Sequence, residues 1–130
     1  MQDRFKFRVW YNPQPTYDDY PKMLYDAENT YDFMRTPDLI PADSFGELLE
    51  DKDFIVMQCT GLKDKNGKLI YEDDIVKFKT ELFGKPKQII WDECHYILKD
   101  TFIILCDMEI KQFGLEVIGN IYENKELLNE

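Results

Sequence analysis

Length, composition and charge limit what this chain can be. It has 130 residues, the size of one domain, and a content of 44% hydrophobic and 15% aromatic residues excludes a disordered protein. The net charge of -10 disfavours non-specific binding to nucleic acids, because an acidic surface repels phosphates. Three cysteines are too few for a disulfide framework, and no apolar run approaches the ~20 residues of a membrane span. We therefore expect a soluble, cytoplasmic protein without a signal peptide.

The first predicted element is a strand over residues 4–10, where apolar and polar side chains alternate. Its two faces consist of Phe5, Phe7 and Val9 on one side and of Arg4, Lys6, Arg8 and Trp10 on the other. We expect the basic face to be solvated, although it could also serve as a binding surface.

Residues 11–43 are predicted to be irregular, with short pieces of strand. Prolines interrupt this segment repeatedly, at Pro13, Pro15, Pro21, Pro37 and Pro41. Its many tyrosines and methionines predict packing, either within the chain or between copies, and the sequence leaves both open. Ser44 and Glu47 have the spacing of a capping box, which predicts a short helix over residues 45–51.

A β-hairpin is predicted in the middle of the chain. A strand over residues 54–60 is followed by Asn66-Gly67 and by a second strand over residues 69–71. Asn-Gly is typical of the type I′ turn, which matches the twist of paired strands. An acidic turn at residues 72–74 then leads into a strand over residues 75–79.

Further short strands are predicted over residues 88–91, 95–99, 101–106 and 115–122, with a terminal helical turn at 124–129. The strands 95–99 and 101–106 form either one bent strand or a hairpin through Lys99-Asp100. Five or six short strands at this spacing are typical of a small barrel or sandwich.

Three segments resemble the YopX-like family of bacteriophage and prophage proteins. They are KFRVW at 6–10, QCTGLKDKNGKLIYEDDIV at 58–76, and IGNIYEN at 118–124 followed by Glu126-Leu127-Leu128. The chain departs from the usual family pattern at Cys59 (usually aromatic), Asp73 (usually Gly) and Lys125 (often Pro). If the turn at Asp73 requires a positive φ, Asp is tolerated there less well than Gly, so we expect either a different turn geometry or mild strain.

The resemblance implies a mainly β protein, α+β overall. It implies a C-terminal SH3-like β-barrel over about residues 54–122, within a domain of residues 54–130, and a smaller N-terminal α+β part over residues 1–53. It also implies a phage or prophage setting. It implies no biochemical activity, because no residue of this chain matches an established functional residue of the family.

The residues predict no catalytic, metal or cofactor site. Cys94 and His95 are adjacent, and adjacent residues of a strand point to opposite faces, so we expect them not to pair. No Cys-x-x-Cys motif supports a zinc site, and Asp64-Lys65-Asn66-Gly67 lacks the other ligands of a calcium loop. The carboxylates of residues 72–74 fit a solvated turn.

One candidate partner-binding site remains. It consists of lysines at the hairpin tip and an aromatic pair further on: Lys63, Lys65, Lys68, Trp91 and Tyr96. Together they could form a basic-aromatic groove for single-stranded nucleic acid, which the net charge opposes. Our leading hypothesis is a non-enzymatic module that binds another protein or itself. The alternatives are a nucleic-acid-binding module and an acidic mimic that inhibits a host enzyme.

Overall fold

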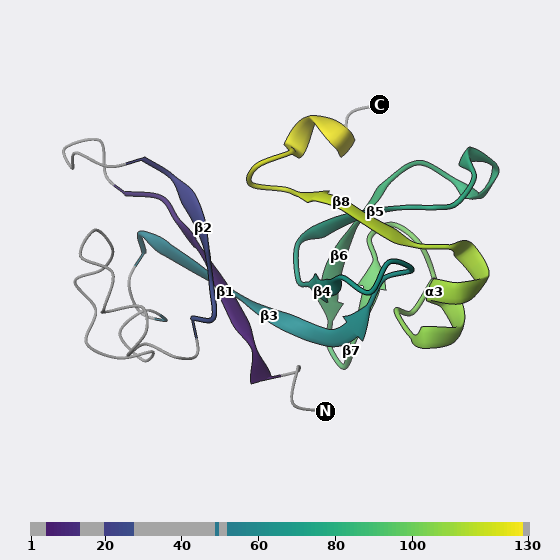
Figure 1. Ribbon diagram of the computed structural model, residues 1–130, viewed down its shortest axis with the longest axis horizontal. Helices are drawn as coiled ribbons and strands as arrows, with labels where there is room; N and C mark the ends of the chain where they lie inside the picture. The colour runs from purple at the N-terminus through teal and green to yellow at the C-terminus, as the bar shows by residue number, and fades with distance from the viewer. Residues whose placement is uncertain (1–4, 14–19, 28–48, 50–51, 129–130) are drawn as a thin grey trace.

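Two antiparallel four-stranded sheets organise the protein (Figure 1). This computed structural model describes residues 5–13, 20–27, 49 and 52–128. The first sheet has the order β2-β1-β3-β4, with β1 (Phe7–Tyr11), β2 (Lys22–Tyr25), β3 (Phe54–Lys63) and β4 (Leu69–Tyr71). The second has the order β7-β6-β5-β8, with β5 (Asp74–Lys77), β6 (Lys87–Asp92), β7 (His95–Leu98) and β8 (Glu116–Asn120). The prediction of a mainly β protein is confirmed.

Helical pieces are short. The 3₁₀ turns η2 (Glu81–Phe83) and η3 (Lys125–Leu128) and the helix α3 (Asp107–Phe113) lie among the described residues. The turn predicted near the C-terminus is confirmed by η3. The helix predicted over residues 45–51 lies outside the described residues, apart from Leu49. Within residues 11–43, β2 confirms a short piece of strand, and residues 14–19 and 28–43 are outside the described ranges.

The strand β3 links the two halves of the molecule (Figure 1). Its first half pairs with β1, from Tyr11 opposite Phe54 to Phe7 opposite Gln58, and its second half pairs with β4. The register of β3 against β4 shifts near Gly61. Gly61 has a φ of 86°, a conformation that glycine adopts at little cost because it has no Cβ. The strand therefore continues to Lys63 instead of ending at residue 60, as the sequence had predicted.

Two apolar clusters fill the interior. The larger consists of Ile70, Val76, Phe78, Ile89, Leu98, Leu105, Ile110, Leu115 and Val117, and the smaller of Val9, Tyr11, Ala27 and Phe54. Burying each large apolar side chain contributes about 1.5–3 kcal/mol, so the larger cluster is the main source of stability.

The hairpin is confirmed, but the predicted type I′ turn is wrong. That turn needs a positive φ at both central residues, and within the loop only Gly67 has one, at 84°. The amide of Gly67 donates to the carbonyl of Asp64 at 3.0 Å, and the amide of Asp64 donates to the carbonyl of Lys68 at 2.8 Å. This is a three-residue loop closed by a left-handed glycine. The Asp64 carboxylate selects it, because it accepts the amide hydrogens of Asn66 and Lys68 at 2.8 and 2.9 Å.

The polar face of β1 is not solvated at Arg8, which corrects the prediction. Arg8 is only 2% exposed. Its Nη1 lies 2.8 Å from Oδ1 of Asp74, and its Nη2 donates to the carbonyl of Glu72 at 3.0 Å. The guanidinium also lies over the ring of Tyr71, 4.9 Å from its centroid. Alternation identifies two faces of a strand, but it does not reveal that the second sheet covers one of them.

The chain after β7 differs from its prediction. Residues 101–106 form no strand and contribute a single bridge, Ile104 to Ile97, after the chain turns back at Asp100. The helix α3 was not predicted. It has seven residues, no side-chain cap at its N-terminus, and only Ile110 buried, so its sequence carries little helical signal.

Candidate functional site

Three cavities open on the described surface. The aromatic groove, of about 330 Å³, is lined by Phe5, Gln58, Cys59, Thr60, Leu62, Trp91, Cys94, His95, Tyr96 and Leu105. The Arg8 pocket, of about 420 Å³, is lined by Arg8, Tyr25, Lys63, Gly67, Lys68, Leu69, Tyr71 and Asp74. The hairpin–helix cavity, of about 360 Å³, is lined by Lys63, Asp64, Lys65, Asp107, Ile110, Lys111 and Gly114.

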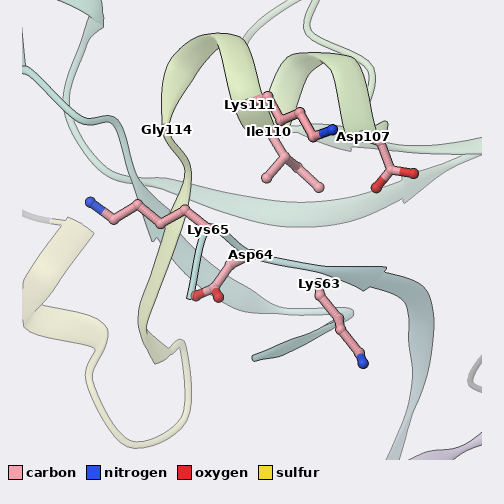
Figure 2. Close-up of a pocket in the computed structure, with 7 residues that line it drawn as sticks. All are labelled: Lys63, Asp64, Lys65, Asp107, Ile110, Lys111 and Gly114. Carbon is pink, nitrogen blue, oxygen red and sulfur yellow. The ribbon is translucent and has the colours of Figure 1, made fainter. Parts of the chain in front are cut away.

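The charged groups of the hairpin–helix cavity do not converge. Figure 2 shows the amino groups of Lys63 and Lys65 pointing in different directions, both away from Asp107 and Lys111 on α3. Nζ of Lys65 instead lies 3.3 Å from a carboxylate oxygen of Glu116. We therefore regard this cavity as a structural junction between the hairpin and α3.

The predicted partner-binding residues are divided between cavities. Lys63 lines both the Arg8 pocket and the hairpin–helix cavity, Lys65 lines the latter, and Lys68 lines the Arg8 pocket. Trp91 and Tyr96 line the aromatic groove. The structure thus brings the two aromatic residues together and the lysines into other cavities, so none of the three cavities combines both sets.

The aromatic groove is built on the β6–β7 hairpin. Trp91 and Tyr96 are opposite each other in the strand register and therefore share one face, with ring centroids 4.9 Å apart and an interplanar angle of 67°. Phe5 is 66% exposed and Trp91 51% exposed. Exposure of this extent around one concave surface is typical of a binding site for another molecule.

The segment that follows β7 enlarges the apolar surface. The amide of Leu105 donates to the carbonyl of Tyr96 at 2.9 Å, which holds this segment beside the groove. Phe102 is fully exposed, and Ile104 and Met108 are 47% and 72% exposed. The apolar surface around residues 102–108 therefore adjoins the groove.

Carboxylates lie near the groove, although none is among the residues that line it. Burial, and after it the nearby Glu72, Cys59 and Asp73, together raise the pKa of Tyr96 to about 12. Asp92 and Glu93 are exposed at the turn of the β6–β7 hairpin. A cationic group entering the groove would therefore be attracted.

Cys94 and His95 do pair, which corrects the prediction. Sγ of Cys94 lies 3.1 Å from Nδ1 of His95. Cys94 belongs to the turn between β6 and β7, where Glu93 has a φ of 57°, so the alternation of a strand does not apply. The strand register pairs Asp92 with His95 and makes Glu93-Cys94 a two-residue turn. Asp92, a residue type that favours turns, is the sequence signal that could have indicated it. The side chains of Cys94 and His95 line the aromatic groove, where they can form hydrogen bonds with a ligand.

Asp73, where the family usually has glycine, does adopt a positive φ. Its φ is 70°. Its carboxylate accepts hydrogen bonds from Nε2 of Gln88 at 2.9 Å and from the hydroxyl of Tyr122 at 3.3 Å. Burial, the charge of Asp73 and this hydrogen bond raise the pKa of Tyr122 to about 12. The two hydrogen bonds offset the backbone strain.

Replacement of Asp73 by glycine is expected to be nearly neutral. Relief of the backbone strain should raise the free energy of unfolding by about 1 kcal/mol. Loss of the two half-exposed hydrogen bonds should lower it by a similar amount. Asp73→Ala keeps the strain and loses the bonds, so it should lower the free energy of unfolding by about 1–2 kcal/mol. Urea denaturation measures both, and equal losses for the two variants would contradict this account.

No helix within the described ranges has the length and the apolar character that a membrane crossing requires.

The fold and the groove define a class: a small, mainly β protein of two antiparallel sheets with an exposed aromatic cleft. The YopX protein family model matches residues 6–129, and the chain belongs to that family, as its resemblance predicted. The crystal structure of protein EF1440 from Enterococcus faecalis is similar in fold, with a TM-score of 0.57 and 24% identity. The match covers 95% of this chain and 96% of that one. No curated protein matches the sequence.

Proposed function

We propose that this chain is a non-enzymatic accessory protein of a phage or prophage, active in the bacterial cytoplasm, that binds another protein through the aromatic groove. Membership of the YopX family supports the phage setting. We also propose that the strands β3 to β8 form an SH3-like barrel within a domain of residues 54–130, preceded by an N-terminal part of residues 1–53. The spacing of these short strands supports that assignment.

The observation that carries the proposal is the exposure of Phe5 and Trp91 at one concave surface. A tryptophan buried on binding is one of the residues that contribute most to protein–protein affinity. Leu62 and Leu105 add apolar walls, whereas Cys94 and His95 supply polar groups that can fix the orientation of a bound chain.

The charges around the groove favour a basic segment as its occupant. Glu72 and Asp73 act on Tyr96, and Asp92 and Glu93 lie at the hairpin turn. An arginine or lysine over the face of Trp91 would gain a cation–π interaction near these carboxylates. We therefore propose that the groove binds a partner segment in which a basic side chain is flanked by apolar ones.

Selection from a display library of random peptides tests this proposal. We expect peptides rich in arginine or lysine to be enriched on the wild-type protein. Trp91→Ala should weaken the binding of a selected peptide by about 30-fold or more, the effect of losing a principal contact residue. Leu82→Ala is the matched control, because Leu82 is 93% exposed on η2 and does not line the groove.

Three outcomes would overturn the proposal. They are the absence of any selectable peptide, equal binding to Trp91→Ala and the wild type, and enrichment of acidic peptides. Light scattering on a sizing column measures the oligomeric state as a further test. A dimer that Trp91→Ala dissociates would identify a second copy of this chain as the occupant and would contradict a basic partner segment.

A further inference from the structure

The Arg8 pocket is a second cavity with its own chemistry, which the proposed function does not use. It lies between the N-terminal strands and the β3–β4 hairpin: Arg8 comes from β1, Tyr25 from β2, and Lys68 from the hairpin tip. Its volume of about 420 Å³ is within the range of pockets that hold small organic ligands.

Positive charge is in excess at this pocket. Arg8, Lys63 and Lys68 line it, with Asp74 as the carboxylate among its lining residues. Asp74 is already paired with Arg8 through Nη1 at 2.8 Å. Among the described residues, neither Lys63 nor Lys68 forms an ion pair. The three cationic residues and one carboxylate leave an excess of positive charge at this cavity of a chain whose net charge is -10.

The Arg8 side chain, which lines the pocket, does not use all of its hydrogen-bond donors. Nε of Arg8 is buried and has no hydrogen-bond partner within the part of the chain that the structure describes. Burial raises the pKa of Asp74, and the charges of Arg8 and Lys68 lower it. The ammonium group of Lys68 is thus close enough to act on the buried pair.

Aromatic rings form one wall. Tyr25 and Tyr71 meet edge to face, with centroids 5.8 Å apart, and Tyr25 is 50% exposed. The guanidinium of Arg8 lies over Tyr71, so Tyr25 is the ring that a planar ligand could stack on. Stacking of a nucleobase on an aromatic side chain is favourable for every base, because each has a π face.

We propose that the Arg8 pocket binds a nucleoside phosphate, with the phosphate between Lys63 and Lys68 and the base against Tyr25. Cationic groups and a stacking ring at one small cavity match the two halves of such a ligand. The nucleotide can be free or the end of a single strand, since both present the same chemistry.

Titration calorimetry with AMP tests the proposal, with inorganic phosphate and adenosine as partial ligands. We expect saturable binding of AMP, weaker binding of each partial ligand, and amide shifts in NMR spectra at Lys68 and Leu69. Lys68→Gln should weaken AMP binding by about tenfold, the effect of losing one charge-assisted contact. Lys99→Gln is the control, because Lys99 is exposed and lies outside the pocket.

Binding of a short oligonucleotide with a 5′ phosphate distinguishes a free nucleotide from the end of a single strand as the ligand. Tighter binding of the oligonucleotide than of AMP, with a steep dependence on salt, assigns the pocket to a strand end; equal binding assigns it to a free nucleotide. The proposal is overturned if AMP does not bind at low salt, if its amide shifts lie elsewhere, or if Lys68→Gln binds it as the wild type does. Lys68 and Lys99 are both exposed, so Lys68→Gln and Lys99→Gln leave the folded core intact.

Discussion

Replacement of Arg8 by methionine is expected to lower the free energy of unfolding by about 3–5 kcal/mol, which is typical of breaking a buried ion pair from one side. The substitution leaves the Asp74 carboxylate buried without its ion-pair partner, and only the exposed Lys68 still acts on it. It also leaves the carbonyl of Glu72 without the hydrogen bond from Nη2. Urea denaturation followed by circular dichroism measures the loss.

The double variant Arg8→Met, Asp74→Leu is the control for this prediction. Buried ion pairs replaced by apolar side chains of similar volume are often as stable as the original. Burial raises the pKa of Asp74 in spite of Arg8, which indicates that desolvation outweighs the attraction within the pair. The buried amide of Tyr71 donates to Oδ2 of Asp74 at 2.8 Å and loses this acceptor in the double variant, so we expect it to recover only part of the loss. A double variant that recovers none of the loss would contradict the explanation by an unpaired buried charge.

The loss in Arg8→Met should depend on pH in a definite direction. Without the guanidinium, the pKa of Asp74 rises further above its ordinary value. A carboxyl whose pKa is raised on folding contributes stability at low pH, and this contribution is lost as the pH rises through the folded pKa. The deficit relative to the wild type should therefore be smallest near pH 4 and largest above pH 7. A deficit that does not change with pH would contradict this explanation.

Replacement of Asp64 by alanine is expected to cost about 3 kcal/mol, the second large effect. Its carboxylate accepts amide hydrogens from Asn66, Lys68 and Val117 at 2.8, 2.9 and 2.9 Å. Water can take the place of the carboxylate as the acceptor for the amides of Asn66 and Lys68, because both residues are exposed. The amide of Val117 is buried, so it would lose its partner, and an unsatisfied buried donor costs about 1–3 kcal/mol. The hairpin tip would also lose one of its connections to β8, while the ion pair of Lys65 with Glu116 would remain.

Lys65→Ala is the matched control in the same turn. Its ion pair with Glu116 is partly exposed, and such pairs contribute less than about 1 kcal/mol. Asp64→Asn keeps one acceptor oxygen and should fall between the two. If Asp64→Ala is no less stable than Lys65→Ala, the carboxylate does not hold the hairpin against β8.

Local sequence patterns predicted most strands of this protein, because alternation and turn residues act over a few positions. The strands β1, β4, β5, β6, β7 and β8 all lie where apolar side chains recur between turn residues. The same reasoning identified Trp91 and Tyr96 as candidate site residues. The YopX resemblance came separately, from the residues of three segments, of which the block over residues 58–76 is long and specific.

Only the tertiary structure decided which faces are covered and which side chains meet. Arg8 looks like part of a solvated face until the second sheet places Asp74 beside it. Lys63, Lys65 and Lys68 look like one basic cluster with Trp91 and Tyr96, yet they line other cavities. The sequence by itself determined the strands, the hairpin and the family. The burial of Arg8 and the composition of each cavity depend on contacts between residues far apart in the chain, which no local pattern encodes.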